Sequence, residues 1–96
     1  MQHNMTRDYT GTLIILNEKG LHTRPATELV KCASSFKSQI FLEYQGKKVN
    51  AKSLLSILML AATRGSKISI YASGGDAKSA VDTLKKLASS KFNIKY

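Results

Sequence analysis

The segment from Gly20 to Ala26, which reads GLHTRPA, contains the residues best suited to chemistry. His22 comes directly before a predicted helix, and Arg24 follows two residues later. The first backbone N–H groups of a helix have no intrahelical partner and can bind anions, and the helix dipole adds positive potential there. A guanidinium offers phosphate a rigid set of donors, and a neutral imidazole is a nucleophile for a phosphoryl group. The segment predicts a phosphate site that holds its own acceptor, although His22 and Arg24 could also be an ordinary helix flank and a surface charge.

The helix that would position this pair is predicted over residues 23–36. Its apolar residues recur at helical spacing and form one face, and Pro25 falls in the first turn, where proline is tolerated. The face consists of Ala26, Leu29, Val30, Ala33 and Phe36.

The rest of the chain alternates between the two kinds of pattern. Apolar alternation or short β-rich runs predict strands over 13–16, 40–45, 47–50 and 68–73. Apolar stripes predict helices over 54–60 and 77–88, with Ser53 and Asp76 as N-caps. The order β-α-β-β-α-β-α predicts an α+β fold, with a four-stranded, largely antiparallel sheet and three helices on one face. The opposite face of the sheet is expected to stay in contact with water.

The composition limits the classes to which the protein can belong. Its 96 residues predict a single domain over 1–96, with residues 1–11 as a loosely ordered tail. The single cysteine, Cys32, excludes an intrachain disulfide, and no cluster has the ligand spacing of a metal site. No apolar run is long enough to cross a membrane, and the first residues do not resemble a secretory signal. We therefore expect a soluble, cytoplasmic protein that needs no metal or cofactor.

The net charge of +9, from 15 Lys and Arg against 6 Asp and Glu, favours acidic partners. A nucleic-acid-binding domain is one alternative. The basic residues are dispersed along the chain, and we expect neither a contiguous basic face nor an aromatic stacking platform. The sequence therefore argues against nucleic acid.

The predicted helix over 54–60 is apolar nearly all round. A short helix on a single sheet cannot bury every side, so some of Leu54, Leu55 and Leu58 should face outwards as a contact patch. The spacing fits plain core positions equally well. Ser53, at the N-cap, is a place where an added phosphate would be stabilised by the helix dipole, although most serines at this position are only caps.

Three segments in order give the chain a specific resemblance. GLHTRPA, then NAKSLLSILML, then Gly65 to Ala77 with the pattern GxxIxIxAxGxDA resemble the phosphocarrier protein HPr family of the bacterial phosphoenolpyruvate-dependent sugar phosphotransferase system. The resemblance extends from about Leu13 to Leu87. It implies an open-faced β-sandwich and a carrier that relays a phosphoryl group rather than an enzyme that turns over alone.

The resemblance also assigns roles. It implies that His22 accepts the phosphoryl group from phosphorylated enzyme I and passes it to EIIA proteins, and that Arg24 stabilises the phosphorylated imidazole. Ser53 matches the serine modified by HPr kinase/phosphorylase in many bacteria. The docking surface matches Thr23, Lys52, Leu54, Leu55 and Leu58.

The chain departs from the family pattern in three ways. Thr23 stands where alanine is usual, Ser56 where glycine is frequent, and the net charge is unusually positive. The resemblance also leaves open a regulatory paralogue that acts by protein binding and carries no phosphate. A monomer is the default expectation, and the sugar or pathway downstream is not encoded in the sequence.

Overall fold

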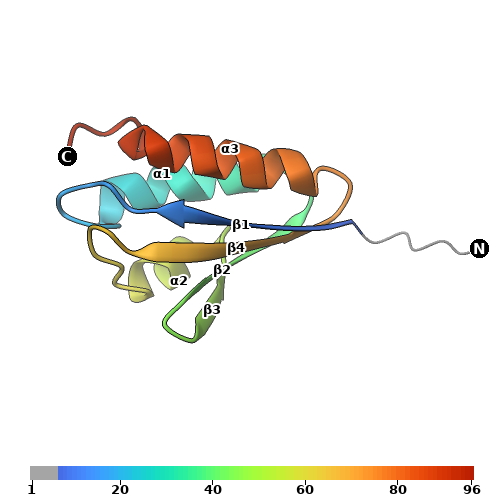
Figure 1. The fold of residues 1–96 in the computed structure, drawn as a ribbon, viewed down its shortest axis with the longest axis horizontal. Coiled ribbons are helices and arrows are strands. Elements are labelled where there is room, and N and C mark those ends of the chain that lie inside the picture. The colour runs from blue at the N-terminus through green and yellow to red at the C-terminus, as the bar shows by residue number, and fades with distance from the viewer. Residues whose placement is uncertain (1–6) are drawn as a thin grey trace, which may run out of the picture.

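Four strands form one antiparallel sheet, and three helices pack with it around a single core (Figure 1). The computed structural model describes residues 7–96. In chain order the elements are β1 Asp8–Ile14, α1 Thr23–Ser34, β2 Gln39–Tyr44, β3 Lys47–Asn50, α2 Leu54–Met59, β4 Lys67–Ser73, α3 Ala77–Ser89 and the short turn η1 Lys91–Asn93. The strand order is β1-β4-β2-β3. The α+β, open-faced architecture expected from the sequence is confirmed.

The central strand β4 shows how the sequence creates the two faces of the sheet. Ile68, Ile70 and Ala72 are buried, and the residues between them are partly exposed, because successive side chains of a strand point to opposite faces. Ile40 and Leu42 of β2 are buried on the same side. The buried face carries the helices, and within the described part of the chain no helix lies over the other face (Figure 1).

The helices bury the stripes that their spacing predicts. α1 buries Ala26, Leu29 and Ala33, and α3 buries a longer stripe, Ala77, Ala80, Val81, Leu84 and Ala88. α2 packs against α1 and β3 and adds the fully buried Ile57 to the core. The predicted boundaries are right to within two residues for each helix.

Two details of the sequence interpretation are wrong. β1 begins at Asp8, so residues 8–11, expected in a loose tail, are paired with β4, while residues 1–6 lie outside the described residues. Asp76 occupies the N-cap position of α3, but its carboxylate does not cap that helix. It accepts instead from the backbone N–H groups of Lys37 and Ser38, both at 2.9 Å, and so ties α3 to the chain that enters β2.

Candidate phosphoryl-acceptor site

His22 stands at the N-cap of α1, at the end of a loop fixed by Gly20. Gly20 has φ +71°, and a Cβ there would lie 2.5 Å from the carbonyl oxygen of Ala62. The next residue, Leu21, donates its N–H to that same oxygen at 2.9 Å. The close approach of two backbones thus requires a glycine, and it fixes where His22 enters the helix.

The first turn of α1 offers free donors around His22. The carbonyl of His22 accepts from the N–H of Ala26 at 2.9 Å, which closes the first helical turn. Pro25 has no N–H, so Thr23 and Arg24 supply the helical N–H groups that lack an intrahelical partner. The turn contains no acidic residue, and His22 does not use its side chain as a cap. The positive end of the helix is therefore available to an anion.

The imidazole of His22 is half-buried and presents its two nitrogens differently. Nε2 is buried and has no hydrogen-bond partner among residues 7–96. A buried nitrogen cannot meet an incoming phosphorus atom without a rearrangement, so Nδ1 is the better-placed acceptor. The sequence predicted the residue, but it could not distinguish the two nitrogens, because burial depends on tertiary contacts.

Two further side chains lie at this site and were missed by sequence reasoning. The ring of Tyr96 stacks on the imidazole of His22, with centroids 5.7 Å apart and 21° between the planes. Arg24 donates from a guanidinium nitrogen to the Tyr96 hydroxyl. The ammonium of Lys19 lies 5.2 Å from the centre of the same ring, and the guanidinium carbon of Arg24 lies 5.4 Å from it. The site therefore has two cations that both lie close to one aromatic ring.

Ser53 is the N-cap of α2, as predicted. Its hydroxyl accepts from the N–H of Ser56 at 3.4 Å and donates to the Ser56 hydroxyl at 3.0 Å. Its neighbour Lys52 donates its ammonium to the carbonyl of Phe36 at 2.7 Å, so this lysine is engaged rather than free. The sequence signal for the cap was sufficient because an N-cap interaction is local.

The structure separates Ser53 from His22. The Lys52–Phe36 contact places the beginning of α2 beside the chain that leaves α1. The Leu21–Ala62 contact places the chain that leaves α2 beside the beginning of α1. α2 therefore runs antiparallel to α1, and Ser53 and His22 lie at opposite ends of the pair.

An apolar stripe on α2 spans the distance between these ends. Leu55 and Met59, four residues apart, are 70% and 65% exposed, and Leu54 is 37% exposed. Leu58 is different, because it is partly buried against the core. The sequence left open whether the three leucines belong to the core or to an exposed patch. The structure exposes Leu54 and Leu55 and packs most of Leu58 against the core. Met59 is a further exposed residue of this patch and was not predicted.

Comparison with known proteins settles the family. The family model "PTS HPr component phosphorylation site" matches residues 9–90. The chain belongs to the HPr family of phosphocarrier proteins.

Solved HPr structures share the fold closely. HPr-C-His from Thermoanaerobacter tengcongensis is 41% identical, with a TM-score of 0.86 over 92% of this chain and 99% of that one. The phosphocarrier protein HPr from Bacillus anthracis str. Ames is 37% identical, with a TM-score of 0.79 over 86% and 96%. Crh, the catabolite repression HPr of Bacillus subtilis, is also 37% identical, with a TM-score of 0.70 over 78% and 86%, and forms a swapped dimer.

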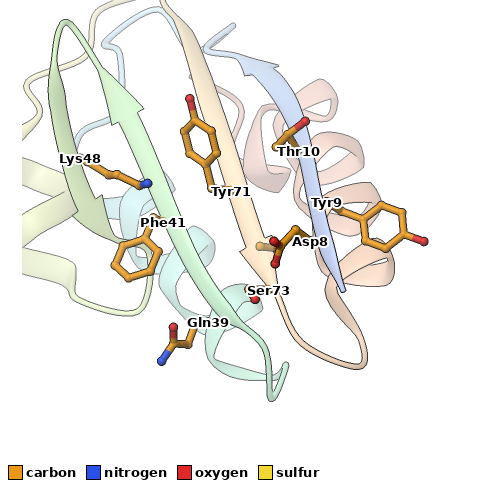
Figure 2. Close-up of a pocket in the computed structure, with 9 residues that line it drawn as sticks. Asp8, Tyr9, Thr10, Gln39, Phe41, Lys48, Tyr71 and Ser73 are labelled. Atoms are coloured by element: carbon orange, nitrogen blue, oxygen red, sulfur yellow. The ribbon is translucent and has the colours of Figure 1, made fainter. Parts of the chain in front are cut away.

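The open face of this HPr-family sheet carries a shallow cleft of about 360 Å³ (Figure 2). Phe41 and Tyr71 are cross-strand neighbours there, and the ammonium of Lys48 lies 5.6 Å and 4.5 Å from their ring centres. The sequence analysis did not foresee this pairing of two rings, because strand register, which brings them together, cannot be read from spacing. Strand alternation and pairing put Lys48 and Lys67 on this face against Asp8 and Glu43. On this face of the sheet, two positive charges therefore stand against two negative charges, so the face itself has no net positive charge.

Other forms of chemistry find little support in residues 7–96. In that range no three His, Cys, Asp or Glu side chains gather in a way that would hold a metal ion. Burial raises the pKa of the Cys32 thiol, which disfavours the thiolate needed for metal binding or nucleophilic attack. No helix in the described range has the length and apolar character needed to span a membrane.

Proposed function

We propose that His22 is a transient phosphoryl carrier that receives its group from phosphorylated enzyme I and passes it to EIIA proteins. The observation that supports this most strongly is the position of His22 at the N-cap of α1, with two free N–H groups in the first turn. The Arg24 guanidinium is bonded to Tyr96, the residue whose ring stacks on the imidazole. The transfer is in line between two imidazoles. A lone pair on His22 Nδ1 attacks phosphorus, and the electrons of the breaking P–N bond remain on the imidazole of enzyme I.

Arg24 and the amides of Thr23 and Arg24 stabilise the phosphoryl group on His22. The two amides and the arginine are a moderate set of donors. A carrier must release its cargo, so stronger binding of the phosphorylated state would slow the second transfer. The Thr23 side chain lies at the same end of the helix, where a partner would meet it.

The docking surface in this proposal consists of Thr23, Lys52, Leu54, Leu55 and Leu58. The exposure of Leu54 and Leu55 supports it, and Met59 extends it towards the His22 end of α2. Lys52 would contribute mainly through its carbon chain because its ammonium is already bound to Phe36.

Phosphorylation of Ser53 by HPr kinase/phosphorylase would regulate docking. It would add nearly two negative charges at one end of the apolar stripe formed by Leu55 and Met59. Because Ser53 and His22 lie at opposite ends of the α1–α2 pair, the effect would arise at a surface that one partner covers, rather than by contact between the two phosphates. Enzyme I binding should therefore weaken, while the chemistry at His22 itself remains intact.

Incubation with enzyme I and labelled phosphoenolpyruvate tests the carrier function. We expect acid-labile, alkali-stable label on the wild-type chain, no label on His22→Ala, and full label on Ser53→Ala. A wild-type chain that stays unlabelled under conditions in which a known HPr is labelled would refute the proposal.

A regulatory role without phosphate transfer is the second candidate, favoured by the similarity to Crh. It predicts that His22→Ala supports sugar phosphorylation as well as the wild type does. It also predicts that substitutions on the α2 stripe abolish the regulatory phenotype. The same His22→Ala variant therefore separates the two candidates.

A further inference from the structure

Tyr96 makes three contacts with the proposed phosphate site and none of them has a role in the mechanism above. It stacks on His22, accepts a hydrogen bond from Arg24, and lies beneath the Lys19 ammonium. Arg24 projects from an exposed position in the first turn of α1, where its long side chain has many conformers. The Tyr96 hydroxyl selects one of them.

An unusual backbone turn brings Tyr96 to this place. The three residues of η1, Lys91, Phe92 and Asn93, all have positive φ, between 56° and 62°. Left-handed conformations of this kind are unfavourable for residues other than glycine and persist only where surrounding contacts hold them. This turn follows α3 and packs against both α3 and α1, and the residues after it bring Tyr96 to His22 at the beginning of α1.

The contacts that hold the turn are buried. Phe92 is fully buried in the core. Asn17, also fully buried, donates its amide to the carbonyl of Lys91 at 3.0 Å. Asn17 belongs to the loop that leads to His22, and its carbonyl accepts from the N–H of Gly20 at 2.9 Å. One buried side chain therefore joins the His22 loop to the segment that carries Tyr96.

From this arrangement we infer that Tyr96 is a positioning residue for phosphoryl transfer, which holds the Arg24 guanidinium beside His22 until the phosphoryl group arrives. The inference rests on the proposed function of His22. A neutral phenol oxygen is a weaker acceptor than a phosphoryl oxygen. The guanidinium, which has five donors, therefore turns towards the phosphoryl group as transfer proceeds, and Tyr96 keeps its ring against the imidazole. Preorganised donors at a reacting centre lower the barrier because they need no further ordering.

The substitution Tyr96→Phe tests the role of the hydroxyl alone, because the ring and its stacking remain. Loss of a hydrogen bond to a charged group is expected to lower the rate of phosphoryl transfer by about 3- to 10-fold. We expect kcat/KM for phosphorylation by enzyme I to fall by that factor, mostly through kcat. The matched control is Tyr9→Phe, which removes a hydroxyl from an exposed tyrosine of β1 (Figure 2). The control should match the wild type.

A double-mutant cycle with Arg24→Gln shows whether Tyr96 acts through Arg24. If it does, Tyr96→Phe has little further effect in the Arg24→Gln background. Equal fold-effects in both backgrounds would overturn the inference. So would wild-type or faster transfer in Tyr96→Phe, because faster transfer would mean that the tyrosine obstructs the site.

A measurement on the unphosphorylated protein keeps the inference testable even if the carrier function fails. The guanidinium Nη resonances of Arg24 should be resolved in the wild type, because the bond to Tyr96 slows rotation, and should merge in Tyr96→Phe. Merged resonances in both proteins would refute the positioning role. A resolved wild-type spectrum with no phosphoryl transfer would refute only the proposed function.

Discussion

Replacement of Gly20 by alanine gives a sharp test of how the His22 loop is held. Two separate penalties apply. The residue has φ +71°, a conformation that costs an L-residue about 1 kcal/mol or more. The new Cβ would also lie 2.5 Å from the Ala62 carbonyl oxygen, a backbone atom that cannot rotate away. Forcing the two backbones apart adds a cost of about 1–3 kcal/mol.

Gly46 is the matched control. It has φ +80°, but a Cβ there meets nothing within 4 Å. Gly46→Ala should therefore show only the conformational cost, about 1 kcal/mol, whereas Gly20→Ala should lose about 2–4 kcal/mol of the free energy of unfolding. The difference between the two variants measures the clash by itself.

Urea unfolding followed by far-UV circular dichroism measures both variants against the wild type. Unchanged m-values would show that the native and unfolded states expose similar surface. Equal destabilisation by the two substitutions would refute the reasoning, since it would mean that the Gly20–Ala62 approach does not constrain the loop. We also expect Gly20→Ala, but not Gly46→Ala, to slow phosphorylation of His22.

Three further predictions follow from the packing and hydrogen bonds. Hydrogen bonds from the Ser38 hydroxyl and the Lys37 N–H lower the pKa of Asp76 to about 2. The stabilisation from the ionised carboxylate is therefore complete above about pH 4 and is lost as the pH falls towards 2. In acid titrations of unfolding, the Asp76→Asn variant should lose less stability over that pH range than the wild type does. Ile57→Ala should destabilise by about 2–5 kcal/mol, whereas the exposed Leu55→Ser should change stability by less than about 0.5 kcal/mol yet weaken enzyme I binding, as calorimetry would show. Ser53→Ala should cost about 0.5–2 kcal/mol through loss of the α2 cap, and an undiminished urea midpoint would contradict that cap.

Strong periodicity made much of the fold predictable. The stripe of α1 and the alternation of β2 and β4 each arise from one apolar face, and such faces are visible in the sequence. β1 was placed too late because its first half lacks that signal. Its polar residues, such as Thr10, lie on the open face of the sheet. Gly11 lies on the face that carries the helices, where Val81 occupies the space that a Cβ on Gly11 would need.

The site was predictable only as far as it is local. His22 and Arg24 are two residues apart at a helix start, and Ser53 caps the helix that follows it, so short-range chemistry made all three candidates. Their roles were assigned only by the resemblance to the HPr family. Tyr96 lies 72 residues from Arg24 and arrives through a left-handed turn of three non-glycine residues. No local preference predicts such a turn, and it exists because buried contacts elsewhere hold it.

The strand order has a consequence for how the protein folds while it is being synthesised on the ribosome. Among the described residues β1 pairs with β4 alone, so its hydrogen-bonding partner is synthesised more than fifty residues later. β2 and β3, by contrast, can close a hairpin at once. Long-range pairings of this kind form late in folding. The loop that carries His22 emerges early from the ribosome but acquires its shape only when β4 and the residues after α3 have followed. A nascent chain should therefore be unable to accept a phosphoryl group until nearly all of it has been made.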